Sequence, residues 1–466
     1  MLHSSVRFEP NRDTHGAQKS GHDAISPLRD SICRVAVKRN YSAFCGHYSL
    51  GAKLKKLIEL NGRCYEWKGQ PTVIICVDGF DPSYLHRGIA DGVLPTISTF
   101  ESRGFIGTAD SAVPTFTVPN NTSIVTGAPP SVHGISGNYY LDRETGKEVM
   151  VTDARLLRSE TVLGRFSQMG VKTAAVTAKD KLRKMLSYNL KGISFSSQCA
   201  DRCTIEENGI TDVEELVGRP KPDMYDPDLS YFVLDAGIRL IQQKSAELLY
   251  LSLSDLVQHS YAPGEPEADA FYKAIDQRIA KFIESGAVVG ITGDHGMSDK
   301  AREDGTPNVL FLEDELNARF GAGAVRVICP ITDPFVMHHA SLGSFVRVYR
   351  KNCADLDALI ETTRSLPGIE LVLDGPSAAK RFEMPLDREG DIVVISQRDV
   401  VIGAVQAEHD LSSLGKHRLR SHGGISEQPV PFILSQPLNS KYRRIAENRP
   451  LRNFDIFDFA LNGIRN

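Results

Sequence analysis

The chain of 466 residues is predicted to adopt an α/β fold, in which a mainly parallel sheet is sandwiched by helices. Segments such as TVIICV (72–77) are apolar at successive positions, which is typical of strands buried on both faces. Amphipathic helical stretches separate these segments, as they do in parallel sheets. Asp78, Asp255 and Asp294 each follow such a segment, at the carboxyl end where parallel sheets gather their functional residues.

Six segments are expected to form the strands of this sheet. In chain order they are 72–77, 104–109, 171–177, 247–254, 287–292 and 430–435. Shorter, partly alternating strands are expected at 343–350, 368–374, 391–397 and 400–405, with a helix over 355–366. We therefore expect a catalytic core built from residues 54–305 and 406–466, and a smaller inserted α+β cap domain at 306–405. Insertions at the carboxyl edge of such a sheet commonly cover the active site.

The composition disfavours several classes of protein. Residues 1–53 are polar and lack sustained periodicity, so we expect a disordered extension, and they lack the apolar core of a secretory signal. No apolar run approaches about 18 residues, the length of a membrane span. The formal net charge of -4 indicates no bulk affinity for nucleic acid or an anionic membrane. Dispersed cysteines favour reduced thiols and a cytoplasmic location, although Cys199 and Cys203 are close enough in sequence to pair or to bind a metal.

Six residues of metal-ligand type lie at the ends of apolar runs or in a glycine-containing loop. They are Asp78, Asp255, His259, Asp294, His295 and His422. Asp255 and His259 are four residues apart, so on a helical turn they share a face and can reach one ion. Structural interpretations stay open for each: a turn after a strand for Asp78, a solvated helix face for the Asp255–His259 pair, and a loop histidine for His422.

The candidate nucleophile is Thr117, in the run PTFTVPNNTSIVTG (114–127). This run is predicted to form a turn followed by a helix start with proline and asparagines. A hydroxyl at a helix start has amide donors and the positive end of the helix dipole beside it, which suits a phosphoryl group. The structural alternative is an N-cap threonine, and Ser111, Thr115 and Thr122 are competing hydroxyls. A two-metal site with a hydroxyl nucleophile is typical of a hydrolytic enzyme.

Together these motifs resemble the alkaline phosphatase superfamily. The resemblance is carried by VDG at Asp78, the run around Thr117, the Asp255-x3-His259 pair, GDHG and the late His422-Gly-Gly. The threonine run resembles the nucleotide pyrophosphatase/phosphodiesterase branch. Within that branch, NGRCYEW (61–67), GISGNYY (134–140) and TAKDKLRKML (177–186) resemble the phosphonoacetate hydrolases. The similarity extends from about residue 55 to the C-terminus and includes the inserted region.

The resemblance implies a site with two Zn²⁺ ions per chain. One ion would be held by Asp78, Asp294, His295 and the Thr117 oxygen, and the other by Asp255, His259 and His422. Asn138 would bond the phosphoryl oxygen, and Lys179 and Lys181 would face the substrate carboxylate. The implied activity is hydrolysis of the C–P bond of phosphonoacetate to acetate and phosphate through a phosphothreonine intermediate. The implied partner is a small-molecule phosphonate, with no nucleic acid and no membrane, and a homodimer stays open.

Two other functional interpretations stay open. The first is a phosphodiesterase or phosphomonoesterase of the same superfamily, acting on P–O bonds. The diesterase branch typically has a histidine where this chain has Asn121, which disfavours a nucleotide diesterase. The second is a metal-binding protein without turnover, which the ligand count disfavours because structural zinc sites close with four protein ligands, often cysteines. Without the resemblance, Lys179 and Lys181 would be interpreted as a solvated helical surface.

Overall fold

The computed structural model describes residues 55–332, 340–351, 355–414 and 417–465. Lys53–Asn466 form one compact unit. The extension expected at residues 1–53 lies outside the described residues. Within them, no helix combines the length and the apolar character that crossing a membrane requires.

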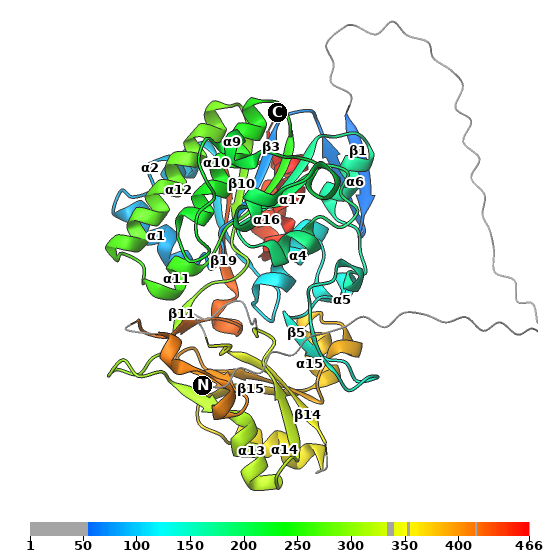
Figure 1. The fold of residues 1–466 in the computed structure, drawn as a ribbon, viewed down its shortest axis with the longest axis vertical. Helices are drawn as coiled ribbons and strands as arrows, with labels where there is room; N and C mark the ends of the chain where they lie inside the picture. The colour runs from blue at the N-terminus through cyan, green and yellow to red at the C-terminus, as the bar shows by residue number, and fades with distance from the viewer. Residues whose placement is uncertain (1–54, 333–339, 352–354, 415–416, 466) are drawn as a thin grey trace, which may run out of the picture. The chain divides into compact units, whose positions relative to one another are not determined.

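An eight-stranded sheet lies at the centre of this unit (Figure 1), in the order β20-β4-β19-β10-β3-β9-β7-β8. Its strands are β3 (Thr72–Cys76), β4 (Phe105–Asp110), β7 (Thr173–Thr177), β8 (Ile193–Ser196), β9 (Leu248–Ser252), β10 (Val288–Thr292), β19 (Pro429–Leu434) and β20 (Leu451–Arg452). β19 runs antiparallel to both of its neighbours, and the other neighbouring pairs are parallel. The predicted mainly parallel sheet is confirmed, and each of the six predicted strands is present.

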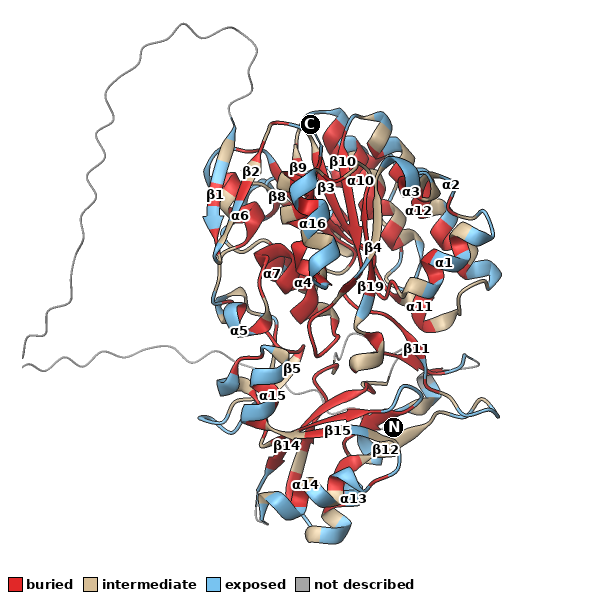
Figure 2. Cartoon of the chain, turned by 180° about the vertical axis from the view of Figure 1, so that it is seen from behind, coloured by how far each residue is buried: buried red, intermediate tan, exposed pale blue. Residues whose placement is uncertain are grey.

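Helices cover both faces of this sheet, as the side chains of β3 demonstrate. Val73 and Ile75 belong to one apolar core, together with residues of α10 (Asp228–Gln242) and α12 (Pro266–Glu284). Ile74 and Cys76 belong to a second core, together with residues of α4 (Thr117–Thr126), α6 (Val162–Gln168) and α7 (Asp180–Leu186). Figure 2 shows the buried strands between these two groups of helices. Burial on both faces explains why these strands are continuously apolar in the sequence.

The remaining helices are short. Before residue 300 they are α1 (Pro82–Ala90), α2 (Pro95–Ser98), α3 (Phe100–Arg103), α4 (Thr117–Thr126), α5 (Pro130–His133), α6 (Val162–Gln168), α7 (Asp180–Leu186), α8 (Ile205–Asn208), α9 (Val213–Val217) and α11 (Leu256–Ser260). After residue 300 they are α13 (Leu312–Phe320), α14 (Leu356–Arg364), α15 (Gly375–Phe382), α16 (Ser440–Asn448) and α17 (Ile456–Asp458).

A second, four-stranded sheet is antiparallel and has the order β13-β14-β16-β15. Its strands are β13 (Val325–Ile328), β14 (Phe345–Arg350), β15 (Ile369–Asp374) and β16 (Ile392–Ser396). Residues of α13, α14 and α15 share an apolar core with it. All four strands come from the region in which the sequence predicts a separate α+β element.

Four strand pairs complete the fold. They are β1 (Lys56–Leu60) with β2 (Arg63–Trp67), β5 (Tyr139–Leu141) with β6 (Glu148–Met150), β11 (Ser298–Asp299) with β18 (Arg420–Ser421), and β12 (Val309–Phe311) with β17 (Val401–Gly403). The β11–β18 pair matters for function, because it brings the chain that follows His295 beside the chain that precedes His422.

Candidate metal centre

Three buried aspartates meet at the carboxyl ends of three neighbouring strands. Asp78 follows β3, Asp255 follows β9 and Asp294 follows β10, and β3 lies between the other two strands. The exposed fraction of each residue is 4% or less. Gly79 turns the chain directly after Asp78 with a φ of +68°, a conformation that favours glycine. Parallel strand order thus explains why residues far apart in sequence converge here.

Asp78, Asp294 and His295 form the first ligand group, with potential ligand atoms within 4.8 Å of one another. His295 Nε2 lies 3.2 Å from Asp78 Oδ1 and 3.8 Å from Asp294 Oδ2. Burial raises the pKa of Asp78 well above its usual range, and the carboxylates of Asp255 and Asp294 raise it further. Burial alone would lower the pKa of His295, but Asp294 and Asp78 outweigh it and raise this pKa to about 10. The group concentrates negative charge that a divalent cation would neutralise.

Asp255, His259 and His422 form the second ligand group, under the same 4.8 Å criterion. Asp255 precedes α11 directly and His259 lies one turn along it, with His259 Nε2 3.0 Å from Asp255 Oδ2. The predicted shared helical face is therefore confirmed. His422 reaches the group from the loop after β18, next to Gly423, whose φ is +125°. A Cβ at Gly423 would lie 2.6 Å from the Phe116 ring, so this loop requires glycine.

All three histidines present the same ring nitrogen to the site. His259 Nδ1 donates to Arg420 O at 2.7 Å, His422 Nδ1 to Thr115 O at 2.7 Å, and His295 Nδ1 to Gly296 O at 2.9 Å. Each Nδ1 therefore carries a hydrogen, which leaves Nε2 as the potential ligand atom. Nε2 lies 3.0 Å from Asp255 Oδ2 in His259 and 3.2 Å from Asp78 Oδ1 in His295. This is the backbone-oriented arrangement that metal-binding histidines usually have.

The donor set fits two divalent cations. Asp78 Oδ1 is buried and receives no hydrogen bond within the described residues, and its ion-pair contact is His295 Nε2 at 3.2 Å, itself a potential metal ligand. A divalent cation bound by both groups would compensate the burial of this oxygen. Carboxylate and imidazole ligands suit zinc and also accept manganese or iron. Each group supplies three protein ligands, so each ion would keep an open coordination position, as catalytic sites do.

Thr117 lies against the first ligand group. It is the first residue of α4, and its Oγ1 lies 3.3 Å from His295 Nε2. Phe116, at the N-cap position, makes no side-chain capping bond, so the first amides of the ten-residue helix are not covered from that position. The hydroxyl and the helix N-terminus therefore face the same site, which suits an anionic phosphoryl group.

The predicted substrate-binding residues share one small cavity with Thr117. This cavity of about 50 Å³ is lined by Asp78, Thr117, Asn138, Lys179, Lys181, Asp255 and His422, among others. Lys179 Nζ lies 3.3 Å from Asp255 Oδ1, and the buried Asn138 Oδ1 receives no hydrogen bond from the part of the chain that the structure describes. The structure therefore brings all ten predicted site residues together, either in the ligand groups or around this cavity.

Asn121 is a further residue of the site, and it contacts Asp294 and Thr117 without lining the cavity. Its Nδ2 donates to Asp294 Oδ2 at 2.9 Å and to Thr117 O at 3.0 Å. Its Oδ1 accepts from Tyr250 at 2.7 Å and from Ser252 at 2.9 Å. The sequence marks Asn121 only as a departure from the diesterase pattern. Because it is fully buried and does not line the cavity, its identity bears on ligand positioning rather than on substrate contact.

Two other features hold the loops of the site in place, and the sequence alone does not predict their contacts. Thr115, a competing hydroxyl in the sequence, is fully buried, donates to Gly424 O at 3.0 Å and accepts from Gly423 N at 2.9 Å. Arg347 of β14 pairs with Glu389 at 2.6 Å and donates to Ser136 O at 2.9 Å, two residues before Asn138. Both partners of this ion pair are fully buried. Neither feature has a local sequence signal, because its partners lie far apart along the chain.

The two clustered cysteines do not form a second metal site. Cys199 and Cys203 are free thiols, as are Cys64, Cys76 and Cys329. In the described part of the chain, neither of the two belongs to a group of three potential ligands. The cysteine pairing or metal role that the sequence left open is therefore absent from the structure.

Known proteins share sequence patterns and the fold with this chain. Residues 72–423 match the family model described as type I phosphodiesterase / nucleotide pyrophosphatase. The phosphonoacetate hydrolase of Sinorhizobium meliloti 1021, solved in complex with phosphonoacetate, is 41% identical, with a TM-score of 0.82 over 88% of this chain and 99% of that one. Murine ectonucleotide pyrophosphatase/phosphodiesterase 5 is 15% identical with a TM-score of 0.55, covering 84% of this chain and 94% of that one, which shows the shared fold alone.

Curated sequences give shorter matches. A pyrophosphatase/phosphodiesterase of Schizosaccharomyces pombe, described as uncharacterized, is 23% identical over 246 residues, which cover 52% of this chain and 44% of that protein. A phosphonoacetate hydrolase of Penicillium oxalicum is 69% identical over 29 residues, 6% of this chain and 40% of that sequence. The chain thus spans less than half the length of these two curated relatives.

Proposed function

This chain belongs to the type I phosphodiesterase / nucleotide pyrophosphatase family of the alkaline phosphatase superfamily, and from that premise we propose that it is a metal-dependent phosphonoacetate hydrolase. It would cleave the C–P bond of phosphonoacetate to give acetate and phosphate. The observation that carries the proposal is the cavity in which Thr117 and Asn138 lie together with Lys179 and Lys181. A phosphonate and a carboxylate on the same carbon need such an arrangement: a nucleophile at one end and cations at the other.

We propose that two zinc ions occupy the ligand groups. When bound, such ions supply Lewis acidity, which favours the deprotonated form of a hydroxyl or water and balances the charge of phosphonate oxygens. Asp78, Asp294 and His295 would hold one ion, and Asp255, His259 and His422 the other.

The chain's own residues would carry the chemistry in two stages. The Thr117 hydroxyl releases its proton to water, its oxygen attacks phosphorus, an O–P bond forms, and the C–P bond breaks. The electron pair of that bond moves into the adjacent carboxylate as an enediolate, which takes a proton from water and leaves as acetate. Lys179 and Lys181 would stabilise the growing charge on the carboxylate, and Asn138 would hold a phosphoryl oxygen. Water then cleaves the phosphothreonine, releasing phosphate and restoring the hydroxyl.

We further propose that residues 306–405 act as a cap domain over this site. Asn138 N donates to Pro330 O at 2.8 Å, and Asn138 Nδ2 donates to Ile331 O at 3.3 Å. Ile331 also lines the cavity. The inserted region thereby supplies part of the cavity wall and holds the residue assigned to the phosphoryl oxygen, which would help to exclude water from a carbanionic intermediate.

Phosphate release from a substrate panel tests the proposed function. The panel contains phosphonoacetate, aminoethylphosphonate, phosphonoacetaldehyde and p-nitrophenyl phosphate, each with the zinc-loaded protein. We expect phosphonoacetate to have the highest kcat/KM by a wide margin. A preference for the aryl phosphate would instead indicate a phosphomonoesterase or phosphodiesterase of the same superfamily.

A further inference from the structure

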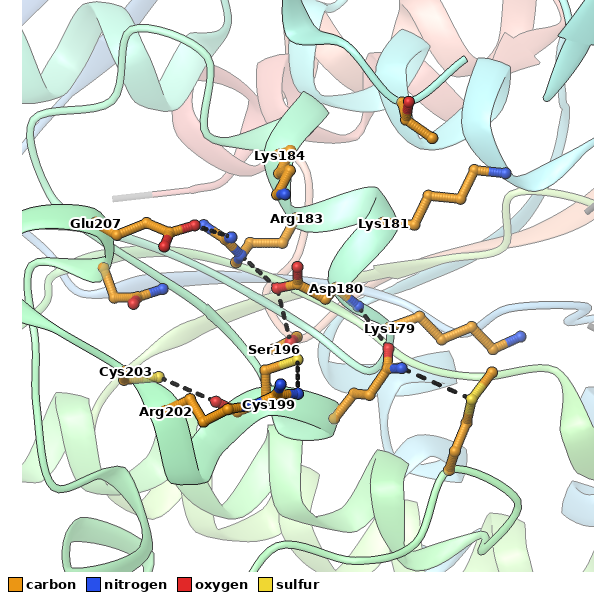
Figure 3. Close-up of a pocket in the computed structure, with 14 residues that line it drawn as sticks. Lys179, Asp180, Lys181, Arg183, Lys184, Ser196, Cys199, Arg202, Cys203 and Glu207 are labelled. Carbon is orange, nitrogen blue, oxygen red and sulfur yellow. Dashed lines mark hydrogen bonds and ion pairs between the residues drawn. The ribbon is translucent and has the colours of Figure 1, made fainter. Parts of the chain in front are cut away.

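A second cavity of about 620 Å³ lies beside the candidate site. Lys179 and Lys181 line both this cavity and the small one at Thr117. In Figure 3 the side chains of Lys179 and Lys181 extend to one side of their turn, whereas Arg183 extends to the other. The turn therefore separates two adjoining spaces. The volume of the larger space is in the range of small-molecule sites, roughly 300–1,000 Å³.

The wall of this larger cavity carries a net positive charge. Its charged lining residues are five cations, Lys179, Lys181, Arg183, Lys184 and Arg202, and two acids, Asp180 and Glu207. Arg183 binds both acids, at 2.6 Å to Asp180 Oδ1 and at 2.6 Å to Glu207 Oε1. Both acids are thus engaged by Arg183, and Lys179 pairs with Asp255 of the active site at 3.3 Å. The cavity offers an anion a positive potential at the rim of the active site.

Two side chains in this wall donate their hydrogen bonds to sulfur, a weak acceptor. Gln198 Nε2 lies 3.7 Å from Met224 Sδ, and Arg202 Nη2 lies 3.2 Å from Cys199 Sγ. Arg202 also approaches the exposed Asp201 at 3.6 Å. The Lys184 ammonium makes no hydrogen bond or ion pair within the described residues, and it is exposed at the cavity. Anionic oxygen would be a better partner than sulfur for each of these donors.

We propose that this cavity is an anion-binding extension of the active site. It would receive the acidic end of phosphonates that are longer than phosphonoacetate, in which the carbonyl next to the C–P bond continues into a chain bearing a carboxylate. The proposal rests on the proposed function, because it needs the carbonyl end of the substrate at Lys179 and Lys181. The chemical step is unchanged: the Thr117 O–P bond forms, the C–P bond breaks, and the electron pair enters the carbonyl as an enolate that water protonates.

A nucleotide is a poorer occupant of this cavity. Proteins commonly hold a nucleobase by stacking it on an aromatic side chain. The residues that line the cavity, all within the described part of the chain, include no phenylalanine, tyrosine or tryptophan. Positive charge without an aromatic platform favours a flexible, carboxylated chain.

The test compares phosphonoacetate with N-(phosphonoacetyl)-L-aspartate. In the second ligand an amide replaces the carboxylate next to the C–P bond, and the attached aspartate carries two carboxylates. Binding to the zinc-loaded protein is measured by calorimetry, and turnover by phosphate release. We expect the amide to bind more tightly than phosphonoacetate. In the double variant Lys184→Glu/Arg202→Glu, its affinity should fall by about tenfold or more relative to that of phosphonoacetate, since two charge-assisted contacts are reversed.

A matched control is Lys441→Glu/Arg443→Glu on α16, which changes the net charge equally but lines neither cavity. Three results would overturn the proposed anion site: an equal loss of affinity for the amide in this control, an equal loss of affinity for both ligands in the Lys184/Arg202 variant, or no tighter binding of the amide by the wild type. If phosphonoacetate neither binds nor reacts, the proposed function fails instead. The calorimetric effect of the Lys184/Arg202 reversal on the amide still decides the anion site in that case.

Discussion

The imidazole rings of His295 and His422 are stacked, with centroids 3.5 Å apart and planes inclined by 8°. The two residues belong to different ligand groups and come from loops 127 positions apart, joined by the β11–β18 pair. Burial lowers the pKa of His422 well below its usual range, and His295 and His259 lower it further. His422 is therefore neutral, which is the form that binds a metal. The two ligand groups are therefore in direct contact through these stacked rings.

Metal content is the first prediction. Purified protein should contain about two zinc ions per chain, and a strong chelator should abolish activity, because the ligands form two groups of three. His259→Ala should lower the zinc content towards one per chain by emptying the second group preferentially. Metal analysis of the wild type and the variant checks this. Equal loss of zinc from both groups would show that the stacked His295 and His422 couple the two groups, so that one ion cannot be lost without the other.

Thr117→Ala should lower turnover by at least about a thousandfold, because it removes the covalent route. Zinc content and melting temperature should stay close to those of the wild type, since Thr117 is only partly buried. Among the described residues, the hydrogen-bond partner of its hydroxyl is His295 Nε2 alone, at 3.3 Å. Thr117→Ser, which restores a hydroxyl, should recover much of the activity. Substantial turnover in Thr117→Ala would instead indicate direct attack by water.

Thr115→Ala is the contrasting variant. It retains Thr117 but removes the hydroxyl that bonds Gly423 and Gly424, so it should cost about 1–3 kcal/mol in free energy of unfolding. Turnover should fall far less than in Thr117→Ala. Denaturant unfolding and steady-state kinetics on both variants check the comparison, and a reversed order of the two activities would reassign the nucleophile.

Asn121→Leu should weaken the first ligand group without touching the substrate. The variant leaves Asp294 Oδ2 without its 2.9 Å donor and leaves the Tyr250 and Ser252 hydroxyls without an acceptor. Loss of such an outer contact typically lowers metal affinity by about 10–100-fold. Ser252→Ala removes one donor to Asn121 only and should be milder. Competitive zinc titration measures both variants, and wild-type affinity in Asn121→Leu would contradict the assignment.

Acid should destabilise the protein through His133. Burial lowers the pKa of this histidine to about 3, and Arg388 lowers it further; the neutral ring contacts Ser123 Oγ at 2.8 Å and accepts from Ile135 N at 3.2 Å. Below an unfolded pKa of about 6.5, the unfolded chain binds a proton that the folded chain does not. Stability should therefore fall as pH drops from about 6.5 towards 3, by up to about 1.4 kcal/mol per pH unit from this residue. Chemical denaturation at several pH values should give a shallower slope for His133→Gln, and an unchanged slope would contradict this.

Sequence patterns predict the parts of the fold that depend on local order. The continuous apolar character of 72–77 and of the other predicted strands follows from burial on both faces. The position of the acids after these strands follows from the geometry of parallel sheets. The spacing of Asp255 and His259 likewise predicts their shared helical turn. Strand order has no such local signal, so the placing of β3 between β9 and β10 comes from the structure.

Residues that act through distant partners were beyond prediction. Asn121 has a role only because Tyr250, Ser252 and Asp294 surround it, and those partners are 129 or more positions away. Arg347 and Glu389 look like ordinary surface charges in the sequence, yet both are fully buried and hold the chain at Ser136. Tertiary packing decides these roles, and a single sequence does not contain a pattern for it.

Variants of Lys179 and Lys181 distinguish phosphonoacetate hydrolysis from general hydrolysis of phosphate esters. Lys179→Ala and Lys181→Ala should each lower kcat/KM for phosphonoacetate by about ten- to a hundredfold, the value of a charge-assisted hydrogen bond of roughly 1.5–3 kcal/mol. Hydrolysis of p-nitrophenyl phosphate, which has no carboxylate, should change much less. Kinetics on both substrates measure the difference, and equal losses would indicate general attraction of phosphate or a structural role.

The central claim is that the zinc-loaded protein breaks the C–P bond of phosphonoacetate. Nuclear magnetic resonance with carbon-13-labelled phosphonoacetate, combined with a phosphate assay, measures both products in one reaction. We predict acetate and phosphate in equal amounts, formed by the wild type and lost in Thr117→Ala. Absence of labelled acetate from a preparation that still hydrolyses p-nitrophenyl phosphate would contradict the claim.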